Sequence, residues 1–153
     1  MRADIHDGRE HNALQAEAGY IDARQLTARS SAARYAQRCY GAERVPIVDF
    51  DAHHGNGSQQ IFWSDRTVMY CSTHEMPLFP GTGAMSERGE HDNIVNAPLR
   101  AGDWGETFRE ALDTAILPRL QKFAPDLIVI SAGFDAHRLD PLANLNLLEA
   151  DFG

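Results

Sequence analysis

Three short runs of apolar and β-branched residues stand out from an otherwise mixed pattern of hydrophobic and polar positions. Residues 45–50 and 67–72 have the composition of buried strands, and residues 127–130 form a continuous apolar run. A continuous run of this kind is typical of a strand that is covered on both faces. We therefore expect three strands, with Pro46 at the start of the first or on an unpaired side, because proline cannot donate to a ladder.

Helical segments are predicted between these strands. Residues 30–39 and 58–63 are short candidates, and residues 106–123 carry an apolar stripe at helical spacing, with Pro118 expected to kink the helix. Strands and helices therefore alternate along the chain. This order predicts an α/β fold with a mainly parallel sheet.

Two segments lack a clear period. Residues 1–30 are polar and charged, and we expect a loose arm there, with a weak helix at most. Residues 75–98 are rich in proline and glycine and are predicted to form one long ordered loop. Long loops in compact domains are often functional, so this segment is a candidate part of a site.

Composition narrows the classes of function. The chain has 153 residues, 14 Lys and Arg against 22 Asp and Glu, a net charge of −8, and 43% hydrophobic residues, which fits one acidic globular domain. The negative charge argues against direct binding of nucleic acid, and neither a membrane span nor a secretory signal is evident. Cys39 and Cys71 are expected to be reduced thiols, which together with the missing signal predicts a cytoplasmic protein.

The richest chemistry lies in Asp49-Phe50-Asp51-Ala52-His53-His54-Gly55-Asn56-Gly57, where the first strand ends. Side chains two residues apart share one face of a strand, so Asp49, Asp51 and His53 are predicted to project the same way. Adjacent carboxylates repel each other unless a positive charge lies between them, and a divalent metal supplies that charge. The two glycines are expected to permit a tight exit at the carboxyl edge of the sheet, where open α/β sheets bind ligands.

A second candidate ligand is Asp135, which follows the apolar run 127–130. If the two strands are parallel, Asp51, His53 and Asp135 form a site with one position open to water, which is typical of catalytic zinc, with manganese as an alternative. Such a metal favours hydrolysis of an amide or ester. Each part alone is ambiguous, because Asp-x-His pairs are common and Asp135 could cap a helix. Together the two motifs favour a metal site.

These motifs resemble the zinc-dependent histone deacetylase and acetylpolyamine amidohydrolase family. The segments VDFDAHHGNGSQQIF, YCSTHE, LFPGTG and VISAGFDAHRLDPL match family motifs in the same order, over about residues 32–153. The resemblance implies a three-layer arginase-deacetylase-like fold, present in part, with residues 31–153 as a partial deacetylase domain and residues 1–30 unmatched. It also implies Zn²⁺ as cofactor and an acetylated amine or acetyl-lysine as substrate.

The resemblance assigns roles to individual residues. It implies zinc ligation by Asp51, His53 and Asp135, and orientation of two catalytic histidines by Asp49 and Asn56. A potassium site is implied at Asp49, Asp51, His53, Ser72 and the Thr73 backbone, and substrate contacts are implied for His54, Phe79 and Leu142. Relatives that bind two manganese ions carry a further Asp where this chain has His54-Gly55, so one metal is expected.

The chain departs from the family pattern in its proton-transfer groups. The upstream His-His pair has no counterpart, since only His6 and His11 precede the first strand, and the family's catalytic Tyr loop would follow Gly153. Tyr70 is expected to be a core residue, His74 and His91 to be solvated or hydrogen-bonded loop residues, and His137 either to contact the site or to face solvent. General acid-base catalysis and an oxyanion donor each contribute about 10² or more in rate. We therefore expect a truncated copy with impaired activity.

Three hypotheses follow from the sequence. The chain is a zinc amidohydrolase, a non-catalytic remnant that still binds zinc and an acyl-amide, or a decayed product without a stable fold. The sequence does not decide between acetyl-lysine and acetylpolyamine. Sheet edges left uncovered would expose apolar surface, so self-association through these edges is a further expectation.

Overall fold

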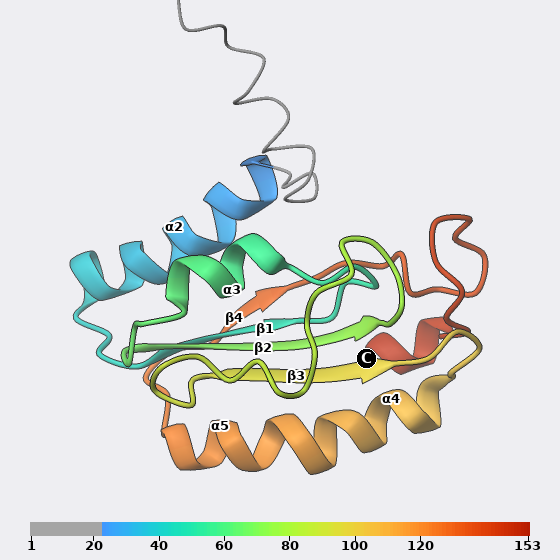
Figure 1. Ribbon diagram of the computed structural model, residues 1–153. Helices are drawn as coiled ribbons and strands as arrows, with labels where there is room; N and C mark the ends of the chain where they lie inside the picture. Colours follow the sequence, from blue (N-terminus) through green and yellow to red (C-terminus); the bar gives the residue numbers. More distant parts are fainter. Residues whose placement is uncertain (1–22) are drawn as a thin grey trace, which may run out of the picture.

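A four-stranded parallel sheet organises the chain (Figure 1). The computed structural model describes residues 23–153. The strands lie in the order β3-β2-β1-β4, with bounds β1 (Val45–Asp49), β2 (Val68–Glu75), β3 (Ile94–Leu99) and β4 (Val129–Ser131). All three neighbouring pairs are parallel, so the predicted α/β class with a mainly parallel sheet is confirmed.

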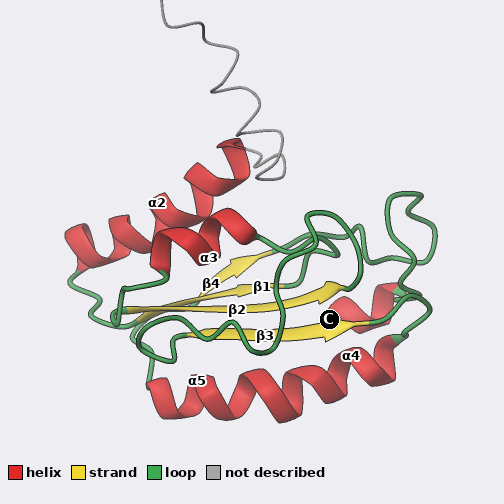
Figure 2. Ribbon diagram, in the orientation of Figure 1, coloured by secondary structure: helices red, strands yellow, loops and turns green. Residues whose placement is uncertain are grey.

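Helices cover both faces of the sheet and give three layers (Figure 2). One face carries α2 (Ala23–Tyr40) and α3 (Asn56–Phe62); the other carries α4 (Gly105–Ala111), the π-helical turn η1 (Leu112–Ile116) and α5 (Leu117–Phe123). Ala33 and Phe62 pack on Ile47 on the first side. Ile116 and Leu120 pack against Val48 on the second. The sheet thus lies between these two apolar clusters.

Two helices differ from their predicted bounds. The helix predicted at residues 30–39 begins at Ala23 and ends at Tyr40. The predicted helix at 106–123 is interrupted at η1, before Pro118, and Pro118 then lies in the first turn of α5. Proline fits this turn because its missing N–H has no helical acceptor there. A π turn widens the helix by one residue, so it explains how the helix accommodates the proline.

The prediction of one long loop over residues 75–98 is wrong in part. Strand β2 extends to Glu75 and β3 occupies Ile94–Leu99, where it pairs with β2. Asn96 and Pro98 break the apolar pattern of β3, so its sequence does not have the continuous apolar run typical of a buried strand. An edge strand tolerates such residues, because its outer backbone groups are unpaired in this sheet.

Strand β4 is more exposed than its sequence suggested. The prediction that it is covered on both faces is wrong, since Ile128 and Ile130 keep 46% and 57% of their surface exposed. The reason is position: β4 lies at the edge of the sheet and pairs with β1 alone among the described strands. Self-association through this edge stays a prediction.

The N-terminal predictions are tested only in part. The predicted arm at residues 1–30 lies outside the described residues up to position 22, together with His6 and His11. Residues 23–30 belong to α2, which agrees with the helical alternative for this part of the segment. Within the described part of the chain, no helix is both long and apolar enough to cross a membrane.

Candidate metal centre

Three side chains from two loops converge at the carboxyl edge of the sheet. Asp51 and His53 follow β1, Asp135 follows β4, and one ligand atom from each lies within 4.8 Å of the others. His53 Nδ1 is 2.6 Å from Asp135 Oδ2 and 3.4 Å from Asp51 Oδ1. We call these three residues the carboxylate cluster. Two carboxylates and an imidazole form a donor set that suits zinc.

Backbone amides hold the two carboxylates in place. The Asp51 carboxylate accepts from the His53 amide at 2.8 Å, and Asp135 Oδ1 accepts from the Ala52 amide at 2.8 Å. Asp135 therefore joins its own loop to the loop after β1, and the alternative that it caps a helix is not what the structure shows. Each carboxylate is oriented by the backbone, as expected of a preformed ligand.

Gly133 allows the two loops to approach each other. A Cβ atom at this position would lie 2.5 Å from Asp51 Oδ2 and 2.7 Å from Asp51 Cα. Neither distance is compatible with a side chain, so glycine is required by the close approach of the two backbones. The glycine of the Ser131-Ala132-Gly133 sequence thus brings Asp135 next to Asp51.

The electrostatics of the cluster favour a cation. Burial and, after it, the neighbouring Asp135 carboxylate raise the pKa of Asp51 to about 6. Both causes express the same fact, that negative charge is crowded here without full hydration. A divalent ion would remove the repulsion and displace the proton.

Asp49 lies below the cluster and faces other partners. Its carboxylate accepts from Arg29 at 2.8 Å and from the Tyr70 hydroxyl at 2.9 Å. Burial raises the pKa of Asp49, and the Arg29 guanidinium opposes this rise. Because β1 ends at Asp49, the alternation of a strand does not continue through Asp51 and His53. Tyr70 is fully buried, as predicted for a core residue.

The predicted potassium donors are close in the sheet but partly occupied. Ser72 lies opposite Asp49 in the register of β1 and β2. Its hydroxyl is 3.0 Å from His74 Nδ1, while the Thr73 hydroxyl is buried with no hydrogen-bond partner among the described residues. The potassium assignment for Asp49, Ser72 and Thr73 stays a prediction.

A second group of polar side chains lies beside the cluster, and we call it the histidine network: His54, His74, Gln59, Glu87 and Asn96. His54 is only 4% exposed. Its Nε2 is 3.1 Å from Gln59 Oε1 and its Nδ1 is 2.7 Å from the Thr82 hydroxyl. Gln59 also accepts from Asn96 at 2.8 Å and donates to Glu87. Burial lowers the pKa of His54.

His74 completes this network. It was predicted in a loop, which is wrong, because it lies in β2; its prediction as a hydrogen-bonded residue is confirmed. Its Nε2 donates to the Gly83 carbonyl at 3.1 Å, and its ring is 4.6 Å from that of His54. Burial and, after it, the neighbouring His54 ring lower the pKa of His74 to about 4. Both rings are therefore neutral near pH 7.

The remaining predicted site residues lie around this edge. Asn56 is the first residue of α3, and its backbone N–H donates to the His54 carbonyl at 2.9 Å. Phe79 lies in the loop after β2 with half of its surface exposed, and Leu142 is exposed in the loop after Asp135. Their roles in substrate contact or orientation stay predictions.

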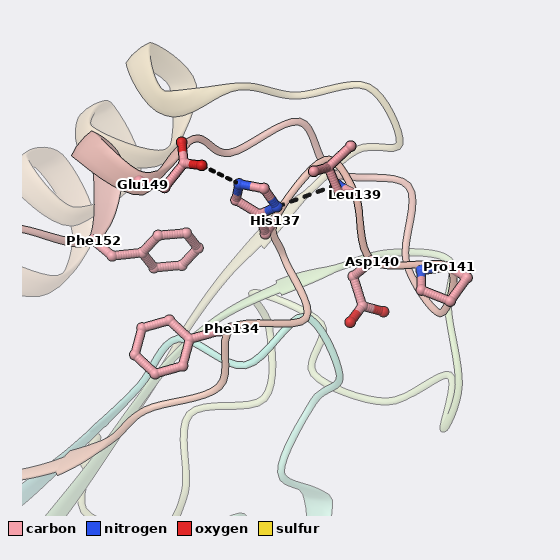
Figure 3. Close-up of a pocket in the computed structure, with 7 residues that line it drawn as sticks. All are labelled: Phe134, His137, Leu139, Asp140, Pro141, Glu149 and Phe152. Carbon is pink, nitrogen blue, oxygen red and sulfur yellow. Dashed lines mark hydrogen bonds and ion pairs between the residues drawn. The ribbon is translucent and has the colours of Figure 1, made fainter.

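A cavity of about 520 Å³ is lined by residues of the loop after β4 and of the C-terminal segment (Figure 3). Its walls are mostly apolar, and the lining residues are Phe134, His137, Leu139, Asp140, Pro141, Glu149 and Phe152. His137 lies 3.5 Å from Glu149 through Nε2, and its Nδ1 accepts from the Leu139 amide at 3.3 Å. The ring of His137 thus lines this cavity beside Glu149, and its two predicted alternatives, contact with the metal site or exposure to solvent, stay predictions.

Comparison with known proteins agrees with this geometry. Residues 29–153 match the Histone deacetylase domain. A rice protein named histone deacetylase 10, chloroplastic, is 44% identical over 79% of this chain. The crystal structure of the HDA15 HD domain superposes with a TM-score of 0.75 at 38% identity over 80% of the chain. The crystal structure of an acetylpolyamine aminohydrolase from Burkholderia pseudomallei superposes with a TM-score of 0.68 at 38% identity over 75% of the chain.

The chain is shorter than these proteins. It spans 28% of the rice protein, 36% of the HDA15 structure and 35% of the acetylpolyamine aminohydrolase structure. The match therefore concerns part of a larger domain.

Proposed function

We propose that this chain, which belongs to the histone deacetylase family, is a zinc-dependent deacetylase-type amidohydrolase. It would remove acetyl groups from acetyl-lysine or acetylpolyamine. Residues 31–153 would form its partial deacetylase domain. The observation that carries the proposal is the convergence of Asp51, His53 and Asp135, from two loops 82 residues or more apart in sequence.

In this proposal, Asp51, His53 and Asp135 hold the zinc, and the loop backbone keeps the two carboxylates in place. Bound zinc would polarise the acetyl carbonyl and make its water acidic. Asp49 and Asn56 would orient proton-transfer groups, and His54, Phe79 and Leu142 would contact the acyl-amide chain. An apolar contact suits a neutral amide better than a charged amine.

A non-catalytic remnant that binds zinc and an acyl-amide is the second candidate. It is favoured because the described side chains near the cluster that could transfer protons already make hydrogen bonds to other residues. His54 and His74 are bound within the histidine network, and the Tyr70 hydroxyl donates to Asp49. We accordingly propose low turnover for this chain, since such groups supply much of the rate in amide hydrolysis.

Zinc content per chain, measured after dialysis, tests the proposed function. We expect about one equivalent in the natural chain and none in Asp135→Ala, since three donors must act together. Asp140→Ala is the matched control, because Asp140 lies on the same loop outside the cluster and should keep its zinc. Absence of zinc from the natural chain would refute both candidates.

Hydrolysis of an acetyl-lysine peptide and of an acetylpolyamine separates the two candidates. Zinc-loaded protein that releases acetate, and loses this activity in Asp135→Ala, supports the enzyme. Zinc-loaded protein that binds a hydroxamate without any hydrolysis supports the remnant.

A cytoplasmic location belongs to the same proposal and is supported by the two unpaired cysteine thiols.

A further inference from the structure

Helix α2 places a cation against the carboxylates at the end of β1. Arg29 Nη1 is 2.8 Å from Asp49 Oδ2, and Arg29 Nη2 is 3.7 Å from Asp51 Oδ2. The Arg29 side chain is 14% exposed, the Asp49 side chain is fully buried and the Asp51 side chain is 13% exposed. A planar guanidinium can bridge two carboxylates in this way, whereas an ammonium group acts as a single point charge.

The charges of the described acidic residues around the cluster can be counted. Asp49, Asp51 and Asp135 contribute three negative charges, and the imidazole of His53 contributes none when it acts as a metal ligand. One divalent ion would leave a single negative charge. The guanidinium of Arg29 removes this remaining charge, so one dication and one arginine neutralise these three described aspartates.

We propose that Arg29 is the built-in counter-cation of this site and takes the place of a separate alkali ion. The proposal rests on zinc binding by the carboxylate cluster. Two of the donors predicted for potassium support it. The Asp49 carboxylate already accepts from Arg29 and Tyr70. The Ser72 hydroxyl is likewise hydrogen-bonded to His74. Among these described side chains, no negative charge is then left for a second cation to neutralise.

Arg29 would also be a positioning residue. It joins α2 to the loop after β1, since it pairs with the last residue of the strand and with a predicted zinc ligand. The Asp51 backbone N–H also donates to the Asp49 carboxylate at 3.4 Å, which links the two aspartates by a long hydrogen bond. Loss of the guanidinium therefore leaves Asp49 buried without its cation and loosens Asp51.

The test compares melting temperatures of zinc-loaded protein in potassium chloride and in choline chloride at equal ionic strength. We expect the natural chain to melt within about 1 °C in the two salts. Arg29→Gln should melt about 10 °C lower in choline, as expected for a broken buried ion pair, and potassium should restore at least half of this loss. Arg34→Gln is the matched control from the same helix, because Arg34 pairs with Asp65 at a more exposed position. It should lose about 2 °C and show no potassium effect.

Two outcomes would overturn the proposal. One is a natural chain whose melting temperature rises with potassium as much as that of Arg29→Gln. The other is an Arg29→Gln variant that melts like the natural chain and ignores potassium. Zinc content, measured on the same samples, separates these failures from a failure of the proposed function, in which the natural chain would hold no zinc at all.

A second variant keeps the test decisive if Arg29→Gln does not fold. Combining Arg29→Gln with Asp49→Asn removes the cation and its buried partner together. We expect this double variant to fold and to ignore potassium, because no unpaired charge remains. A double variant that also fails to fold would show that Arg29 acts in some other way, and would overturn the proposal.

Discussion

His53 and His54 are neighbours in sequence but belong to two different environments. His53 enters the carboxylate cluster, where negative charge is crowded and the pKa of Asp51 is raised to about 6. His54 enters the histidine network, where both ring nitrogens are hydrogen-bonded and burial lowers its pKa. The cluster is thus poised to bind a cation, while the network is satisfied without one. The comparison separates a site that needs a ligand from a buried polar support.

The largest expected effect comes from removing His53. We expect His53→Ala to weaken zinc binding by more than about 100-fold, because the loss of a direct ligand exceeds the 10- to 100-fold cost of losing an outer partner. His91→Ala is the control, since His91 is exposed in a loop. Zinc affinity would be measured by competition with a chelating dye. Equal affinity in His53→Ala and the natural chain would place the site elsewhere.

Removing His54 should lower the stability of the fold and leave zinc binding nearly unchanged, the opposite of the result expected for His53. His54→Ala leaves the Thr82 hydroxyl and the Gln59 carbonyl short of a partner and opens a cavity, which we expect to cost about 3 kcal/mol of unfolding free energy. Urea denaturation measures this loss. Zinc content should stay near that of the natural chain, because His54 lies outside the cluster. Loss of zinc without loss of stability would reverse the comparison.

The network also predicts a pH dependence. The pKa of His74 is lowered in the folded state to about 4, so its neutral form contributes stability above the unfolded pKa of about 6.5. This contribution is lost as the pH falls from 6.5 towards 4, by about 2 kcal/mol. His74→Gln, which cannot titrate, should lose less stability over the same range. Parallel curves of unfolding free energy against pH for the two proteins would contradict this expectation.

The smallest effect concerns the protonation of Asp51. Its pKa is raised to about 6 in the folded state, and zinc binding requires the carboxylate. Zinc affinity should therefore fall by up to about tenfold per pH unit below pH 6 through Asp51. In zinc-free protein, the stability of the fold changes with pH in the opposite direction to zinc affinity. Protonated Asp51 favours the folded state below the unfolded pKa of about 3.9, and this contribution is lost as the pH rises through 6. Asp51→Asn should abolish that loss in zinc-free protein, and a zinc-free Asp51→Asn variant that keeps it would contradict the assignment.

The carboxylate cluster could be predicted from the sequence, and the histidine network could not. Asp51, His53 and Asp135 follow apolar runs, and the ends of neighbouring parallel strands meet at one edge of a sheet. Gln59, Glu87 and Asn96 come from a helix, a loop and the unpredicted strand β3. No local spacing relates these three residues, so only the folded structure brings them to His54.

The fold shows the same division. Strand β1 and the parallel class follow from local patterns, because each apolar run is long enough to indicate a strand. The exposure of Ile128 and Ile130 depends on which strand lies at the edge, and a sequence period carries no information on that order. Arg29 was likewise missed, since its pairing with Asp49 depends on how α2 lies over the sheet.

The separation of Asp135 from Ala52 in the chain has a consequence for folding kinetics. The contact between Asp135 and the Ala52 amide closes a loop of 83 residues, whereas β1 and β2 pair across a much shorter connection. The entropic cost of closure grows with loop length, so contacts of high sequence separation are expected to form late. A zinc-dependent signal during refolding would thus time the docking of β4 on β1, after β1 and β2 have paired.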